Sequence, residues 1–194
     1  MPSFTRAELE AFRGGTIPEL ISPNTRLLFV GFNPGLRSAA VQAPFALRSN
    51  RFWPTLYRAG ILDRDVNASH GLSDADRDHL FERGVGITSL VRQATARADE
   101  LTAAQLVAGA EALTKRVASL PPGIVAILGI TAYPLAFGRP VVLPNPQPDR
   151  IGTSAVWVLP NPSGLNAHAT AAALATAYRE AAIAAGIAVF DPPA

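Results

Sequence analysis

Short apolar runs recur along this chain, each too short for a buried helix and each followed by residues that favour turns. Residues 26–31 end in a glycine, and residues 124–128 are apolar throughout. Runs of this length and composition are typical of strands covered on both faces. Residues 85–90, 141–143 and 155–159 are the other predicted strands.

Helical patterns fill the segments between these runs. Thr102 and Gln105 form a capping box ahead of a long helix that reaches about Leu120, and Ser73 begins another that ends at Gly84. The remaining helices are expected from Thr5 towards Gly14, over 51–59, shortly after Gly129, and over 170–185. Alternating strands and helices predict an α/β fold, a three-layer α/β/α sandwich with a short, mainly parallel central sheet.

Composition excludes several classes of protein. The 194 residues are 48% hydrophobic and 16% charged, which argues against disorder, and their number favours one domain over 1–194 with a core at about 26–185. The chain has no cysteine, so disulfides, thiol nucleophiles, zinc fingers and iron–sulfur clusters are excluded. Neither a membrane span nor an export signal is recognisable, and we expect a cytoplasmic protein.

The formal net charge of +2 conceals an uneven distribution of acidic residues. Segments 25–62 and 151–179 contain no Asp or Glu, whereas carboxylates concentrate between Asp63 and Glu111. One positive face would suit a polyanionic partner such as nucleic acid. The sixteen arginines beside a single lysine, Lys115, are also explained by genomic base composition, and scattered surface arginines are ordinary.

Two loops with similar sequences follow the first and last predicted strands. Residues 31–36 read Gly-Phe-Asn-Pro-Gly-Leu, and residues 160–166 read Pro-Asn-Pro-Ser-Gly-Leu-Asn. Ligands of parallel α/β sheets bind beyond the carboxyl ends of the strands, which is where both loops should lie. The alternative is that Asn-Pro and Pro-Ser-Gly only form turns.

The loops match no nucleotide-binding or hydrolase motif. Gly-x-Gly-x-x-Gly, Gly-Lys-Ser/Thr and Gly-x-Ser-x-Gly are all absent, and His70, His79 and His168 lack metal-ligand spacing. What remains is the amide of Asn33, which can donate and accept hydrogen bonds, with the ring of Phe45 nearby. Phe45 could equally anchor its loop. No metal or cofactor is expected.

The order and spacing of these motifs resemble one family. Gly-Phe-Asn-Pro-Gly-Leu-Arg-Ser-Ala from Gly31, Asn-Arg-Phe-Trp from Asn50, Gly-Ile-Thr-Ser-Leu-Val from Gly86 and Leu-Pro-Asn-Pro-Ser-Gly-Leu from Leu159 are similar to the mismatch-specific uracil-DNA glycosylases. This is the bacterial branch grouped with thymine-DNA glycosylase in the uracil-DNA glycosylase superfamily. The resemblance covers about residues 26–185 and implies hydrolysis of the bond between a flipped base and its deoxyribose.

The resemblance also implies roles for individual residues. Asn33 would position the attacking water, Phe45 would stack on the base, and Ser38 would help to discriminate thymine from uracil. The other substrate-binding residues implied are Gly31, Phe32, Pro34, Gly35 and Asn161. Leu165 would fill the gap left by the flipped nucleotide, and the other DNA-binding residues implied are Arg37, Ser163, Gly164, Asn166 and His168.

Two positions depart from the family pattern. Asn166-Ala167-His168 follow Leu165 where the family usually has a basic residue, so His168 is expected either to contact DNA or to cap the next helix. Asp99 lies in the loop after the second predicted strand. It would either act catalytically, by activating water or stabilising a cationic sugar, or place a charge at the start of the next helix.

The sequence therefore predicts a monofunctional DNA glycosylase of base-excision repair. The expected substrate is uracil, with thymine or damaged pyrimidines as further bases, in mismatched double-stranded DNA. The expected protein is a nucleoid-associated monomer without a membrane partner. Two alternatives remain: a non-catalytic protein of the same fold that binds a base or damaged DNA, and an α/β enzyme acting on a free small molecule.

Overall fold

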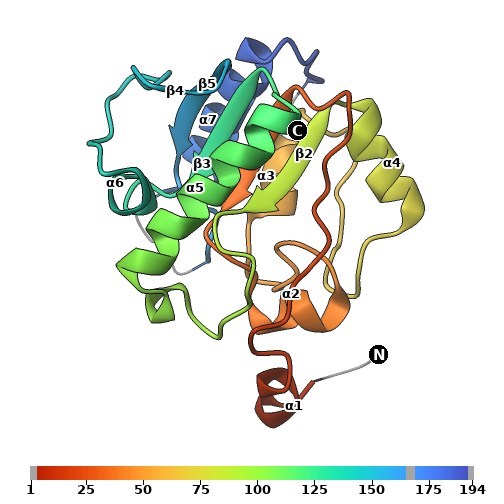
Figure 1. The fold of residues 1–194 in the computed structure, drawn as a ribbon. Helices are drawn as coiled ribbons and strands as arrows, with labels where there is room; N and C mark the ends of the chain where they lie inside the picture. Colours follow the sequence, from red (N-terminus) through yellow and green to blue (C-terminus); the bar gives the residue numbers. More distant parts are fainter. Residues whose placement is uncertain (1–3, 165–168, 192–194) are drawn as a thin grey trace.

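A five-stranded, mainly parallel sheet forms the centre of the computed structural model, which describes residues 4–164 and 169–191. The strands are β1 (Leu27–Gly31), β2 (Val85–Ser89), β3 (Ile124–Leu128), β4 (Arg150–Ile151) and β5 (Ser154–Leu159). Their order across the sheet is β2-β1-β3-β5-β4, and only β4 runs antiparallel to its neighbour (Figure 1). The predicted strands at 26–31, 85–90, 124–128 and 155–159 are confirmed within a residue of their ends.

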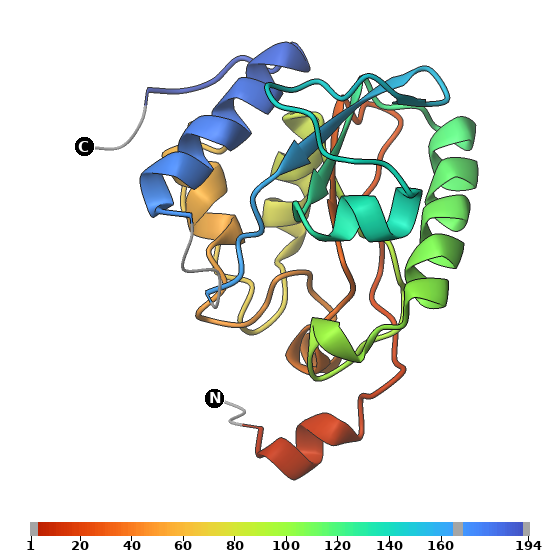
Figure 2. The same cartoon turned by 90° about the vertical axis from the view of Figure 1, so that its left-hand side faces the viewer.

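Helices cover both faces of this sheet, which confirms the three-layer α/β/α arrangement (Figure 2). One face is covered by α3 (Phe52–Arg58), α4 (Asp74–Glu82) and α7 (Ala171–Ala184), and the other by α5 (Ala103–Ser119) and α6 (Ala132–Phe137). Successive side chains of a strand point to opposite faces. Leu27 and Phe29 accordingly join the first core cluster, and Leu28 and Val30 the second.

Side-chain caps define where the helices begin, as the sequence predicts. Thr102 and Gln105 form the expected capping box of α5, and Ser73 accepts a hydrogen bond from the backbone N–H of Asp76 at the start of α4. Caps of this kind stabilise a helix by about 1 kcal/mol. In the described part of the chain, no helix combines the length and apolar character needed to traverse a bilayer.

The predicted strand at 141–143 is wrong, because side chains rather than a neighbouring strand satisfy its backbone. The Gln147 side chain accepts a hydrogen bond from the Val142 N–H and donates one to the Val142 carbonyl, each at 2.8 Å. Asn145 makes the same pair of bonds with Val158 of β5, at 2.9 and 3.0 Å. The edge strand is instead the short β4.

Residues 32–49, where the sequence predicts no helix, contain one, α2 (Leu36–Val41). Its N-cap is Gly35, which offers no side-chain acceptor, so the usual signal for a helix start is missing. The helix is also shorter than isolated sequences can sustain, and it forms because Leu36 and Ala39 are buried against Ala94 and Ile17. At the N-terminus, α1 is confined to Arg6–Glu10.

Candidate active site

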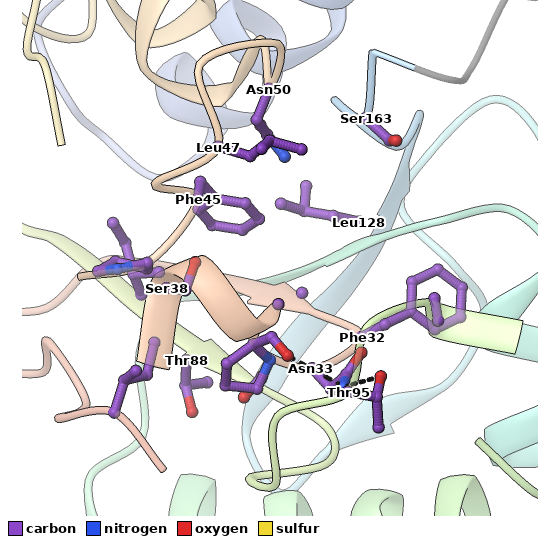
Figure 3. A pocket seen from close by; sticks show the side chains of 18 of the residues that line it. Phe32, Asn33, Ser38, Phe45, Leu47, Asn50, Thr88, Thr95, Leu128 and Ser163 are labelled. Atoms are coloured by element: carbon purple, nitrogen blue, oxygen red, sulfur yellow. Dashed lines mark hydrogen bonds between the residues drawn. The ribbon is translucent and has the colours of Figure 1, made fainter. Parts of the chain in front are cut away.

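A cavity of about 200 Å³ opens where β1 and β2 end (Figure 3). Gly31 closes β1, Ser89 closes β2, and both line it. Asn33 of the first loop and Asn161 of the second also line it, so the fold brings the two Asn-Pro loops to one site. This placement follows the general rule for parallel sheets.

The amide group of Asn33 is held in one orientation. Its Nδ2 donates to the carbonyls of Pro34 at 3.1 Å and Gln93 at 3.0 Å, and to the hydroxyl of Thr95 at 2.8 Å (Figure 3). Carbonyl oxygens only accept, so the nitrogen must face them. The Thr95 hydroxyl donates its own hydrogen to the Arg97 carbonyl at 2.7 Å. Among the described residues none donates to the Asn33 Oδ1, which is left as an acceptor beside the cavity.

Phe45 lies over the end of β1 and is both a loop anchor and part of the cavity wall. Its ring stacks on Phe52 with centroids 4.0 Å apart and an interplanar angle of 19°. A Cβ at Gly31 would stand 3.2 Å from the Phe45 ring, so glycine lets the ring approach the backbone. Phe45 has a positive φ of 54°, which is uncommon for a bulky residue. Both roles left open by the sequence are thus compatible with its position.

Three of the other predicted residues surround Asn33 and Phe45. Ser38, buried in α2, accepts a hydrogen bond from the Ala46 N–H at 3.2 Å and borders the cavity beneath Phe45 (Figure 3). The Pro34 carbonyl accepts from the Thr95 N–H at 3.2 Å, and Gly35 begins α2. These contacts connect the first loop with its neighbours and leave polar groups at the wall.

Phe32, also predicted to bind substrate, serves the core as well as the cavity. Its ring packs over Gly129, where a Cβ would come within 2.6 Å of it and φ is +150°. It contacts the core cluster beneath α5 and α6 while bordering the cavity.

Arg51 clamps the second loop onto the start of α3. Its backbone N–H donates to the Pro162 carbonyl at 2.9 Å. Its guanidinium donates to the carbonyls of Ser163 at 3.0 Å and Ala169 at 2.6 Å. Sequence reasoning missed this residue, because its partners lie more than a hundred positions away along the chain.

The glycine of the second loop packs closely against the rim of the cavity. A Cβ at Gly164 would lie 2.5 Å from the Ser49 carbonyl oxygen, so the second loop passes the chain ahead of α3 with backbone contact. Asn161 accepts a hydrogen bond from the Ser163 N–H at 2.9 Å, which forms an Asx turn. Asn161 and Ser163 line the cavity. Leu165, Asn166 and His168 lie outside the described residues.

Asp99 and Arg37 do not line the cavity. Asp99 lies in a short 3₁₀ helix, Ala98–Glu100, with a side chain 62% exposed. The Arg97 guanidinium hydrogen-bonds to it and lowers the pKa of that carboxyl. Arg37 donates to the Ser69 carbonyl at 2.8 Å and stands 5.6 Å from the Phe4 ring centroid.

The arginines of the acid-free segment 25–62 are largely engaged in holding the fold. Arg26 bonds to the carbonyls of Arg83 and Gly186, and Arg37 and Arg51 also bind backbone carbonyls. Arg48 is exposed and follows Leu47, an exposed apolar residue on the cavity rim (Figure 3). Fewer arginines are therefore available to form a positive face near the site than the sequence suggested.

A polar cluster on the cavity wall was not anticipated. The Glu19 carboxylate accepts a hydrogen bond from the Thr88 hydroxyl, and Glu19, Thr88 and Arg92 all border the cavity. Arg92 approaches one oxygen of Glu19 at 2.7 Å and Arg116 the other at 3.2 Å. Burial lowers the pKa of Arg116. Thr88 lies in the family-like stretch that begins at Gly86, whereas Glu19, Arg92 and Arg116 belong to no recognisable motif, so only the fold reveals the cluster.

The described residues contain no cluster of three or more His, Asp or Glu side chains able to hold a metal ion. The carboxylate on the cavity wall, Glu19, is already paired with two guanidiniums. The groups that line the cavity include amides, hydroxyls, arginines, this carboxylate and the rings of Phe32 and Phe45.

Comparison with known proteins agrees with this fold. Among solved structures, the chain is similar to the solution NMR structure of a candidate uracil DNA glycosylase from Methanosarcina acetivorans, with a TM-score of 0.53 and 15% sequence identity. The match covers 87% of this chain and 98% of that one, and at this identity it supports the fold. The model of the family "Uracil DNA glycosylase superfamily" matches residues 18–184, which include both loops and all but one of the residues that line the cavity. The chain belongs to the uracil DNA glycosylase superfamily.

Proposed function

We propose that this protein is a monofunctional DNA glycosylase that hydrolyses the N-glycosidic bond of uracil in mismatched double-stranded DNA. Membership of the superfamily supports DNA glycosylase activity in general. The observation that carries the finer proposal is the fixed amide of Asn33, whose acceptor oxygen lies at a cavity bordered by an aromatic ring. The mismatch preference rests on the resemblance of the two loops.

In the proposed reaction, the Asn33 Oδ1 accepts a hydrogen bond from a water molecule and so directs the water oxygen at C1′ of the deoxyribose. The bond from the water oxygen to C1′ forms as the bond from C1′ to the base nitrogen breaks. The electron pair leaves with the base, and the proton lost by the water passes to solvent or to the base. The products are a free base and an abasic sugar.

An amide is a weak base, so Asn33 contributes to the rate by orienting the water and not by taking its proton. Most of the acceleration must come from stabilising the departing pyrimidine anion, by preorganised dipoles and charge. Glu19, Arg92 and Arg116 together carry a net charge of +1 if all three are ionised, and Arg92 borders the cavity. This charge favours an anionic leaving group.

Base selection is proposed to depend on Phe45 and Ser38. An extruded base needs stacking to offset the few kcal/mol lost when it leaves the duplex, and Phe45 supplies a ring at the wall. Ser38 lies beneath that ring, where its hydroxyl and small volume set the space left for a 5-methyl group (Figure 3). Leu165, beyond Gly164, is proposed as the apolar wedge that replaces the flipped nucleotide.

The proposal is tested by measuring release of base from labelled duplexes with G:U, A:U and G:T pairs and from single-stranded uracil DNA. We expect the fastest release from G:U. Asn33→Ala should lower that rate about 10³-fold, which is within the range of rate losses found when a side chain that positions the reacting water is removed. Asn24→Ala, an exposed asparagine remote from the cavity, is the matched control. Tight binding to G:U DNA without base release would instead identify a non-catalytic binder, and wild-type rates in Asn33→Ala would refute the mechanism.

A further inference from the structure

The segment that orients Asn33 consists of residues 92–95. It supplies the Gln93 carbonyl and the Thr95 hydroxyl, two of the three acceptors of the Asn33 amide nitrogen. It follows β2 without regular secondary structure of its own. The orientation of Asn33 is therefore only as well defined as the position of this segment.

The chain ahead of β1 fixes this segment from its other side. The Gly14 N–H donates to the Ala94 carbonyl at 2.9 Å, and the Ala94 N–H donates to the Gly15 carbonyl at 2.8 Å. The Arg92 guanidinium donates to the Ile17 carbonyl at 2.9 Å. Residues 14–19 thus form a support that lies against residues 92–95.

Glu19 joins this support to the end of the sheet. One carboxylate oxygen lies 2.7 Å from a terminal nitrogen of Arg92, and the other accepts from the Thr88 hydroxyl and lies 3.2 Å from Nε of Arg116. The side chains are 24%, 31% and 23% exposed for Glu19, Arg92 and Arg116. In such a partly buried cluster, loss of the carboxylate leaves two neighbouring cations uncompensated.

We propose that Glu19 and Arg92 are positioning residues, which hold segment 92–95 so that the Asn33 amide presents its oxygen to the attacking water. The proposal deepens the glycosylase function given above and rests on it for its kinetic consequences. Misplacement of a reacting group by about 1 Å lowers a reaction rate by up to about 10²-fold. A flexible segment 92–95 would therefore lower the rate of base release. Glu19 acts through Asn33 and does not contact the reacting atoms, so its removal should slow the reaction although it raises the net charge of the cluster.

The kinetic test uses Glu19→Gln, which keeps the size of the side chain and removes its charge. Under single-turnover conditions with G:U DNA, we expect a rate about tenfold lower, with the DNA concentration at half-maximal rate unchanged within about twofold. Glu19→Asp, which keeps the charge, should recover part of the rate. Asp149→Asn, which removes the partner of Arg139 on a different part of the surface, is the matched control and should match the wild type.

A double-mutant cycle separates positioning from a general structural effect. If Glu19 acts through Asn33, then Glu19→Gln should cause no further loss in an Asn33→Ala background. A loss that multiplies in the double variant would show that Glu19 acts on the leaving group or on the fold, and would overturn the proposal. If Glu19→Gln does not fold, Arg92→Lys serves in the same cycle, because it keeps the charge and lacks the fork that reaches both Glu19 and Ile17.

A second readout does not depend on activity. The side-chain NH₂ signals of Asn33 can be assigned in ¹⁵N-labelled protein by comparison with Asn33→Ala. We expect Glu19→Gln to shift them and to accelerate their exchange with solvent by about tenfold, with no such change in Asp149→Asn. Unchanged Asn33 signals would overturn the positioning role. A response of these signals in a protein that releases no base would preserve the positioning role and refute the glycosylase proposal.

Discussion

The two loops at the cavity share the dipeptide Asn-Pro after a buried strand, but their asparagines are used in opposite ways. In the first loop the Asn33 nitrogen is bound by protein acceptors and its oxygen faces the cavity. In the second loop the Asn161 oxygen is taken up by the Ser163 N–H two residues on. The same local sequence thus yields an available acceptor in one place and a turn in the other. The difference arises from segment 92–95, which offers acceptors to the first loop.

The loops also differ in what anchors them. Segment 92–95 holds the first loop through an amide side chain, whereas the guanidinium of Arg51 holds the carbonyls of Ser163 and Ala169 in the second. Charged hydrogen bonds of the second kind stabilise a fold by about 1.5–3 kcal/mol each. We therefore expect changes to the first anchor to appear mainly in the rate of reaction, and changes to the second mainly in stability.

Removing the second anchor should have the largest effect on stability. Arg51→Ala loses the guanidinium bonds to Ser163 and Ala169, and we expect a decrease of about 3 kcal/mol in the free energy of unfolding. Urea denaturation followed by tryptophan fluorescence measures it. Arg58→Ala, an exposed arginine at the end of α3, is the control and should change stability by less than about 0.5 kcal/mol. Equal stability of the two variants would mean that the clamp contributes nothing to the fold.

Removing one acceptor of the first anchor should affect the rate. Thr95→Val keeps the shape of the side chain and deletes the oxygen 2.8 Å from the Asn33 nitrogen. We expect base release to slow about fivefold, corresponding to one hydrogen bond of roughly 1 kcal/mol, and Thr95→Ser to restore it. Single-turnover assays on G:U DNA measure the rate. If the valine variant is as fast as the wild type, the amide is held well enough by the carbonyls alone.

Glycines in the two loops should tolerate a methyl group differently. At Gly164 the added Cβ would press on the Ser49 carbonyl at 2.5 Å, so Gly164→Ala should destabilise the protein by about 1–2 kcal/mol. At Gly35 the Cβ meets nothing within 4 Å and φ is −76°, so Gly35→Ala should be neutral or slightly stabilising. Thermal melts of the two variants test this contrast. A similar loss of stability in both variants would contradict it.

Asp99, outside both loops, should have the smallest effect. The sequence leaves a catalytic role open for Asp99. Its side chain is exposed and paired with Arg97, so we expect the rate of Asp99→Asn to lie within about twofold of the wild type. Because the pKa of Asp99 is lowered, its pair with Arg97 is complete above the ordinary Asp pKa and is lost only as the pH falls through the lowered value. We therefore expect no step from Asp99 in a pH–rate profile between about pH 5 and 9. A large loss in Asp99→Asn would restore its catalytic assignment.

Much of the fold was predictable because its signals are local. The apolar run Ile124–Leu128 is β3 to the residue, and the capping box at Thr102 marks the start of α5. The errors arise where side chains replace backbone partners. Gln147 satisfies Val142, which therefore needs no neighbouring strand, and Gly35 begins α2 without a capping side chain.

The site was predictable only in part. That Asn33 and Asn161 lie at one cavity was predictable, because strand ends of a parallel sheet meet at one edge. Thr95, Arg51 and Glu19 were missed, since each acts through a partner far away along the chain, as Thr95 does with Asn33 62 positions away. Such contacts leave no periodic or motif signal. The resemblance to a family suggested roles for individual residues, and the fold revealed the groups that hold these residues in place.

The side-chain amides beside β5 have a consequence for how copies of this protein behave together. An uncovered strand edge invites strand addition and aggregation. Asn145 binds both backbone groups of Val158, and the Gln147 N–H donates to the Val156 carbonyl at 2.7 Å. At the opposite edge, Leu20 exchanges two backbone bonds with Ile87 of β2. Beside β5 and at Ile87 of β2, the chain itself therefore occupies backbone positions that strand addition would need.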